Sequence, residues 1–427
     1  MSKVMQMRFF NDILSSLMDG GLRIPLFSRK DVGGLGDNPE AVLNAVIAAE
    51  GEISSLVHGT HLLDLFEGLP EKQREEFFHL LLSLDLDPDA LAEATSAYRA
   101  SPSAANLETI SRTAEPGWQE VFRRLNATPN GTVRLVRMRE QLIKLAQKTP
   151  ALKRLDTGLK QLIRGWFNPG FLVLKPITWE SPASILEKII AYEAVHEITS
   201  WDDLRARLAP QDRRCFAFFH PSMPDEPLIF VEVALTEETP DTIRSVLAGE
   251  RDIVAQNTAN TAVFYSISNC QRGLEGISFG NFLIKRVAQE LKRDLPGLKT
   301  FVTLSPVPGF RSWLETHDPN LFALSSDKAY LDDESDEKIL AAAARYFLDS
   351  DRPDGRPNDP VARFHLGNGA ILDRLNARGD LSAKAIRQSA GLMVNYRYDL
   401  AKVEQNHEDY VRNGEIKASP DIKRRLA

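Results

Sequence analysis

Hydrophobic residues between Pro39 and Phe167 recur every three or four positions, the spacing that places apolar side chains on one face of an α-helix. Capping residues mark two helix starts, because Asn38 precedes Pro39 and Asp87 precedes Pro88. Short connections suggest neighbours that pack antiparallel as a bundle. The pattern predicts helices over Pro39–Ala49, His58–Glu67, Glu71–Leu84, Pro88–Arg99, Ala104–Thr113, Gly117–Leu125, Val133–Leu145 and Ala151–Phe167.

The pattern changes after Phe167, where short runs rich in β-branched and aromatic residues predict strands. Helices with apolar residues at helical spacing lie between these runs, most clearly Asn281–Lys292. We therefore predict an N-terminal all-α helical bundle followed by an α/β (α+β) domain. The predicted strands are Phe171–Leu174, Cys215–Phe219, Leu228–Leu235, Thr261–Ile267, Thr300–Leu304 and Leu392–Tyr398.

The loop between Thr261–Ile267 and Asn281–Lys292 carries glycines at positions 273, 276 and 280. Glycines let the backbone approach a ligand closely, and the amides and dipole at the start of the following helix favour negative charge. Such a loop suits a phosphate or pyrophosphate, although many glycine turns serve only as tight connections.

Composition excludes several classes of protein. The chain has 427 residues and a net charge of −7, which argues against a general nucleic-acid binder. Its two cysteines, Cys215 and Cys270, form neither a disulfide framework nor a four-thiolate zinc site, and they suit a reducing cytoplasm. No apolar run approaches 18 residues, so we expect no membrane span. His58 and His61 lack a nearby third ligand, so we expect no metal site.

Two polar residues are candidates for catalysis, Ser305 at the end of a predicted strand and His365 in a later segment. A hydroxyl and an imidazole together can orient a carboxylate, move a proton, or act as nucleophile and base. Spacing alone does not bring them together, and an isolated histidine is more often structural.

The stretch Gly276–Gly280 also matches the pattern G-x-S-x-G of a nucleophile elbow, with Ser278 as the nucleophile. His365, with a carboxylate such as Asp318 between them, would complete the chain order of an α/β-hydrolase. However, Asn269–Glu275 separates the strand from the elbow, and the preceding strands look hairpin-linked rather than built from βαβ units. The hydrolase interpretation therefore fits poorly.

The order helix, helix, three strands, glycine loop, helix, strand resembles the GNAT acyltransferase fold. In that fold the pyrophosphate of coenzyme A docks on the loop before the central helix, and the pantetheine lies where two parallel strands splay apart. The usual loop reads Gln/Arg-x-x-Gly-x-Gly/Ala, and the glycine spacing here departs from it.

Seven longer segments over residues 170–400 resemble the malonyl-CoA decarboxylase family. They occur in the family's order. They are Ile177–Ala183, Glu193–His196, Phe264–Ser268, Gly280–Val287, Leu304–Phe310, Phe364–Ala370 and Gly391–Tyr398.

The resemblance implies a helical oligomerisation domain over residues 1–167 and a GNAT-like catalytic domain over 168–427. It implies decarboxylation of malonyl-CoA to acetyl-CoA and carbon dioxide, without metal or organic cofactor, by a homo-oligomer (dimer or tetramer). Because the chain shows no organelle signal, the resemblance suggests a bacterial, cytoplasmic member. The implied catalytic pair is Ser305 and His365, and the implied acyl-CoA loop is Glu275, Gly276, Ile277, Ser278, Phe279, Gly280 and Asn281.

Each candidate then receives an expected role. Ser305 would hydrogen-bond the malonyl carboxylate, and His365 would protonate the enolate carbon because a histidine pKa ordinarily lies near working pH. Lys285 and Arg286 would neutralise coenzyme A phosphates, or one of them would face solvent. Asn368 would position the imidazole or substrate, or cap a helix, and Tyr398 is either a site residue or a buried strand tyrosine.

Two other functions stay open at the level of sequence. A GNAT acyltransferase would move an acyl group to an amine, and would release free thiol only when an amine is present. A noncatalytic acyl-CoA sensor would bind without turnover and would tolerate the loss of Ser305 or His365.

Overall fold

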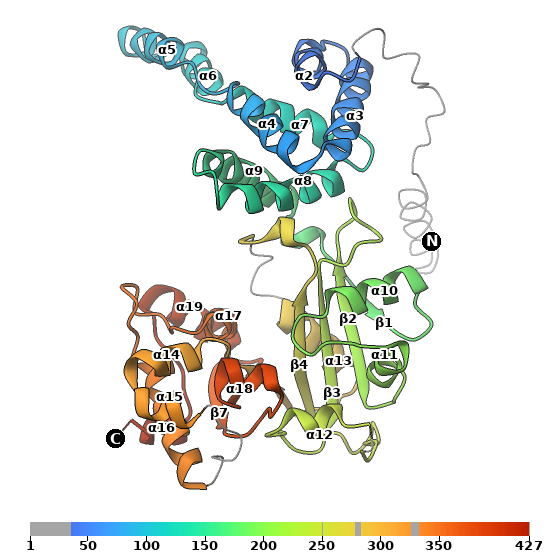
Figure 1. The fold of residues 1–427 in the computed structure, drawn as a ribbon, viewed down its shortest axis with the longest axis vertical. Coiled ribbons are helices and arrows are strands. Elements are labelled where there is room, and N and C mark those ends of the chain that lie inside the picture. The colour runs from blue at the N-terminus through green and yellow to red at the C-terminus, as the bar shows by residue number, and fades with distance from the viewer. Residues whose placement is uncertain (1–35, 250, 278–282, 326–332, 427) are drawn as a thin grey trace, which may run out of the picture. The chain divides into compact units, whose positions relative to one another are not determined.

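The computed structural model describes residues 36–249, 251–277, 283–325 and 333–426. The chain divides into two compact units, and Figure 1 labels most of their helices and strands. Of the described residues, the first unit holds 36–172, 220–224 and 271–277, and the second holds 173–219, 225–249, 251–270, 283–325 and 333–426. Two short segments that follow strands thus belong to the first unit.

The first unit is helical, and α7 packs against α3, α8 and α9 at its centre. Trp118 of α7 is buried against Gly158 of α9, where an added Cβ would lie 2.0 Å from the indole. Its helices are α2 (Pro39–Ala48), α3 (Glu52–Gly68), α4 (Glu71–Leu82), α5 (Pro88–Ala100), α6 (Ala104–Thr113), α7 (Gly117–Asn126), α8 (Gly131–Ala146) and α9 (Leu152–Trp166).

Both predicted N-caps are confirmed. The Asn38 side chain accepts a hydrogen bond from the Glu40 amide at 2.9 Å, and Asp87 accepts from the Asp89 amide at 3.0 Å. The predicted start of the second helix at His58 was wrong, because α3 already begins at Glu52. Because Ser54 and Ser55 are polar, the spacing of apolar residues does not reveal the first turns of α3.

The second unit is built on one mixed sheet of strand order β1-β2-β3-β4-β5-β8-β6, with β7 paired to β8. The pairs from β1 to β4 are antiparallel, whereas β4 and β5 are parallel, as the GNAT resemblance implied. The strands are β1 (Val173–Ile177), β2 (Arg213–Phe219), β3 (Ile229–Thr236), β4 (Thr261–Asn269), β5 (Thr300–Thr303), β6 (Ser305–Pro306), β7 (Ile371–Asn376) and β8 (Met393–Arg397).

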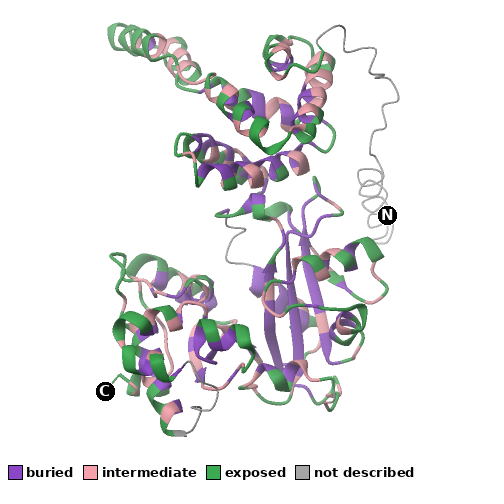
Figure 2. Cartoon of the chain, viewed as in Figure 1, coloured by how far each residue is buried: buried purple, intermediate pink, exposed green. Residues whose placement is uncertain are grey.

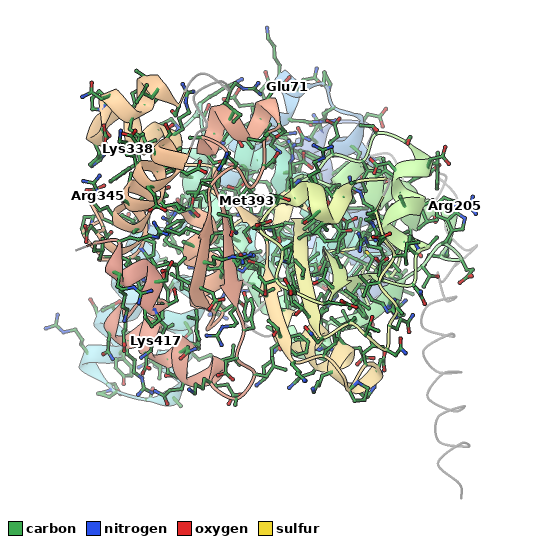
Figure 3. The ribbon with its side chains drawn as sticks, turned by 90° about the horizontal axis from the view of Figure 1, so that it is seen from below. Glu71, Arg205, Lys338, Arg345, Met393 and Lys417 are labelled. Carbon is green, nitrogen blue, oxygen red and sulfur yellow. The ribbon has the colours of Figure 1, made fainter. Side chains whose placement is uncertain are left out.

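Alternate residues of a strand point to opposite faces of the sheet, and helices cover the apolar side chains on these faces. Apolar side chains of α10 (Ala183–Tyr192) and α11 (Trp201–Leu208) pack on Ala217, Phe219 and Phe230. α12 (Ile243–Leu247) packs on a second cluster that includes Val302 and Met393, the latter labelled in Figure 3. Figure 2 shows the buried residues following the strands.

The remaining helices of this unit follow the glycine loop or lie toward the C-terminal end. They are α13 (Leu283–Asp294), α14 (Phe310–His317), α15 (Pro319–Leu324), α16 (Asp333–Leu348), α17 (Pro360–Gly367), α18 (Ala383–Ser389), α19 (Val403–Asn413) and α20 (Pro420–Arg424). The predicted fold class, an all-α bundle followed by an α/β (α+β) domain, is confirmed. No helix in the described part of the chain is long and apolar enough to cross a membrane.

Candidate active site

A β-bulge lies in β4 at the point where its pairing with β5 ends. The register of β3 against β4 passes from Glu232–Ser266 to Val233–Phe264, so Tyr265 is the extra residue. Parallel pairing of β4 with β5 ends near Phe264, whose carbonyl accepts from the Leu304 amide at 3.0 Å. Beyond that point the chain of β5 continues into β6, which pairs with β8 instead. β4 and β6 therefore diverge.

A cavity of about 270 Å³ lies beside the diverging strands. Its lining is mostly apolar, and its polar side chains come from β4, from Ser305 at the start of β6 and from α17. This is the place where the GNAT resemblance puts the pantetheine arm of coenzyme A. The lining consists of Val195, Phe264, Tyr265, Ile267, Asn269, Ser305, Pro306, Pro360, Val361, Phe364 and His365.

Ser305 is buried at the start of β6, where its backbone pairs with Val394 of β8. Its hydroxyl donates to Thr303 Oγ1 at 2.9 Å, and Thr303 Oγ1 also accepts from the Tyr396 amide at 3.1 Å. The serine oxygen is therefore held in one position on a buried strand.

His365 reaches the same cavity from α17. The helix starts at an N-cap, Asp359, whose carboxylate accepts from the Ala362 amide at 2.8 Å, and Pro360 occupies the first helical position. His365 Nε2 lies 3.2 Å from Ser305 Oγ, and its Nδ1 lies 2.8 Å from the Tyr398 hydroxyl. The structure thus brings Ser305 and His365 together across 60 residues of sequence.

The imidazole is neutral in the free protein. Burial alone lowers the pKa of His365 to about 3, so the expectation of a pKa near working pH was wrong for this state. Since the Ser305 hydroxyl donates to Thr303, its oxygen accepts from Nε2–H, and the Tyr398 hydroxyl donates to Nδ1. Tyr396 stacks on the ring, with centroids 4.6 Å apart, and fixes its plane.

Asn368 does not contact the imidazole. It is the C-cap of α17, and its side-chain amide donates to the Phe364 carbonyl at 2.6 Å. Of the two interpretations given for Asn368, helix capping describes its contacts. The residue that holds the imidazole is Tyr398, which follows β8 and is buried.

Lys285 and Arg286 lie in the first turn of α13. The Lys285 ammonium is paired with the Glu404 carboxylate, and the Arg286 guanidinium lies 5.5 Å from the centroid of the Phe218 ring. Glu404 is well exposed, so an anionic ligand could compete with it for Lys285.

The predicted acyl-CoA loop is described only at its beginning. Ser278, Phe279, Gly280 and Asn281 lie outside the described residues. Glu275, Gly276 and Ile277 follow a 3-10 turn, η3 (Arg272–Leu274), and Gly276 has a positive φ of 72°. In the same loop, the Glu275 carbonyl accepts from Arg139 of α8 at 3.0 Å.

Sequence reasoning missed Thr303 and Tyr396 and gave Tyr398 too little weight. A period of two along a strand places Thr303 on the same face as Ser305, which was an available signal. Nothing in the sequence pattern placed the segment of Tyr396 and Tyr398 beside His365.

Comparisons with known proteins place the chain in a family. The family model described as Malonyl-CoA decarboxylase C-terminal domain matches residues 170–427, and the corresponding N-terminal domain model matches residues 84–167. The chain belongs to the malonyl-CoA decarboxylase family. The predicted resemblance is thereby confirmed.

Members of the malonyl-CoA decarboxylase family resemble the chain over most of its length. The mitochondrial enzyme of Anser anser anser is 36% identical over 347 residues, which are 72% of this chain and 69% of that protein. The crystal structure of the Rhodopseudomonas palustris enzyme has a TM-score of 0.87 and 48% identity, covering 91% of this chain and 99% of that one. The Agrobacterium vitis structure gives 0.85 and 49%, with the same coverage of 91% and 99%.

Proposed function

We propose that the chain is a carboxy-lyase that decarboxylates malonyl-CoA to acetyl-CoA and carbon dioxide, with Ser305 and His365 carrying the reaction. Membership of the malonyl-CoA decarboxylase family supports the activity. The observation that carries the assignment of residues is the hydrogen-bonded series Thr303, Ser305, His365 and Tyr398 at an apolar cavity between diverging strands.

The cavity favours loss of carbon dioxide. Among the described residues that line it there is no lysine or arginine, and Ser305 and Asn269 are neutral donors that it offers to the malonyl carboxylate. A carboxylate that moves from water into this cavity loses hydration, which is unfavourable for a charged group. The departing carbon dioxide is neutral and needs no hydration, so its loss relieves this cost. Ser305 would hold the carboxylate out of the thioester plane, which aligns the breaking carbon–carbon bond with the carbonyl π system.

His365 supplies the proton that balances the reaction. The negative charge of the bound substrate raises the imidazole pKa, so binding is accompanied by uptake of one proton. When the bond to the carboxylate carbon breaks, its electron pair forms the thioester enolate, and the imidazolium then protonates C2. This step returns His365 to the neutral state of the free protein.

The pH profile of kcat/KM is a consequence of this proton uptake. Because the pKa of His365 in the free protein is about 3, its protonated fraction rises about tenfold for each unit that the pH falls between 9 and 5. We expect log(kcat/KM) to keep rising with a slope near one per unit as pH falls through 6.5. Initial rates in buffers of constant ionic strength test this, and a plateau below about 6.5 would mean an ordinary histidine pKa instead.

Tyr398→Phe should lower kcat about tenfold and leave KM nearly unchanged, because the imidazole loses one hydrogen bond at 2.8 Å while the cavity lining stays the same. The tyrosine accepts from Nδ1–H once the ring is protonated, so it orients the ring in both states. Tyr410→Phe on α19 removes another buried tyrosine hydroxyl and is the control. An equal loss of kcat in both variants would show that Tyr398 acts only through folding.

The function is tested by mixing purified protein with malonyl-CoA in a buffer free of amines and measuring acetyl-CoA, carbon dioxide and free thiol. Decarboxylation yields acetyl-CoA and carbon dioxide in equal amounts and no free thiol. Thiol that appears only after an amine is added would identify an acyltransferase, and tight binding without products would identify a sensor.

We also propose that the helical unit joins subunits in a homo-oligomer. Support comes from the hairpin of α5 and α6, in which only Ala94 is buried and Leu107 is half-exposed. Sedimentation velocity at several concentrations distinguishes a dimer or tetramer from a monomer, and a monomer throughout would refute the proposal. The cytoplasmic location stays a prediction.

A further inference from the structure

The beginning of the acyl-CoA loop is built onto the helical unit rather than onto the sheet. Residues 271–277 cluster with the helices, and η3 packs against α8. Gly273 lies directly on the backbone of α8, where an added Cβ would come 1.8 Å from the Val136 carbonyl oxygen. Only a glycine permits this approach.

One buried arginine of α8 holds this loop. Arg139 is 2% exposed, and its Nη1 donates to the carbonyl oxygens of Gly273 at 2.6 Å and Glu275 at 3.0 Å. Its Nε donates to Asp156 Oδ1 of α9 at 2.8 Å, which compensates the buried charge. A planar guanidinium can make all three contacts at once because its donors have a fixed fork geometry.

The hydrogen bond from Arg139 to the Glu275 carbonyl also orients the N–H of Gly276. In a trans peptide the C=O and N–H point in opposite directions, so a Glu275 carbonyl turned toward Arg139 turns the Gly276 N–H away from α8. Gly276 is exposed, and no described residue accepts from its amide. An exposed N–H at a glycine of positive φ is suited to a phosphate oxygen.

We propose that Arg139 is a positioning residue for acyl-CoA binding, acting through the loop Glu275–Ile277 on the phosphates of the coenzyme A moiety. This rests on the proposed function. Arg139 touches neither the cavity nor Ser305 and His365. Its loss therefore weakens binding of the coenzyme A portion and spares the chemical step.

The test compares Arg139→Met with Arg134→Met. Arg134 lies on the same helix and is bonded to Asp64 and Glu67, both at 2.7 Å, but it does not touch the loop. We expect Arg139→Met to raise KM for malonyl-CoA at least about tenfold with kcat within about threefold, and Arg134→Met to change neither. Equal effects in both variants, or a fall in kcat with unchanged KM, would overturn the proposal.

A second variant displaces the loop and leaves Arg139 unchanged. Gly273→Ala places a methyl group against the Val136 carbonyl, so it should raise KM in the same way, even where Arg139→Met fails to fold. If the Gly273→Ala protein folds and its KM is unchanged, the positioning role is contradicted.

Binding of coenzyme A itself, titrated by calorimetry, separates this proposal from the function. The affinity for coenzyme A should fall at least about tenfold in both Arg139→Met and Gly273→Ala, whatever substrate the wild type turns over. Wild type that binds coenzyme A but does not decarboxylate malonyl-CoA would refute the function alone. Unchanged coenzyme A affinity in both variants, beside normal wild-type turnover, would refute only the role of Arg139.

Discussion

His365→Ala is expected to lower kcat for malonyl-CoA about 10³-fold, which is within the range contributed by a positioned general acid. The enolate left by carbon dioxide would then have to take its proton from water in a mostly apolar cavity. Affinity for coenzyme A should be unchanged, because no described contact of His365 involves the loop. Quantifying acetyl-CoA by chromatography gives kcat, and calorimetry gives the affinity.

His317→Ala is the matched control. His317 lies on α14, stacks on Trp313 and is partly exposed, so its loss should leave kcat within about twofold. If His365→Ala also keeps kcat within a few-fold of wild type, the proton comes from another group, and the assignment of His365 is wrong. His365→Ala should in addition remove the rise of kcat/KM at falling pH.

Ser305→Ala is expected to lower kcat about 10²-fold, the scale on which removal of one aligned donor acts at a preorganised site. The serine oxygen lies 3.2 Å from His365 Nε2 and lines the cavity, so its loss frees both the carboxylate and the imidazole from a fixed orientation. The effect should be smaller than that of His365→Ala, because the proton donor is still present.

Ser325→Ala is the control for Ser305→Ala. Ser325 is equally buried and donates to the Phe322 carbonyl at 2.8 Å, away from the cavity lining. Initial rates at saturating malonyl-CoA, beside thermal melts, compare the two. If the loss of activity in both variants follows the fall in their melting temperatures, the role of Ser305 is structural.

Much of the framework could be predicted because it depends on local rules. Asn38 and Asp87 cap their helices as the sequence indicated, since capping involves residues two or three positions apart. The succession of strand, glycine loop, helix and strand from Thr261 to Thr303 also followed from periodicity, and the GNAT resemblance implied the parallel β4–β5 pair. Ser305 and His365 were candidates from the sequence, and the family resemblance implied that they form a pair.

The rest depends on contacts between distant residues. Tyr398 holds the imidazole only because it follows β8, and β8 lies between β5 and β6 in the sheet. The pKa of His365 depends on burial, which a sequence motif does not reveal. Likewise, no local pattern shows that Arg139 binds carbonyl groups 134 and 136 residues later in the chain.

The most direct test of the account is a rapid-quench single turnover with protein in excess over malonyl-CoA. It follows the chemical step in wild type, in His365→Ala and in the double variant Ser305→Ala/His365→Ala. Because the two side chains act as one hydrogen-bonded unit, the double variant should be slower than His365→Ala by no more than about threefold, and both should be about 10³-fold slower than wild type. A chemical step in the double variant as fast as in wild type would place the reaction outside this cavity.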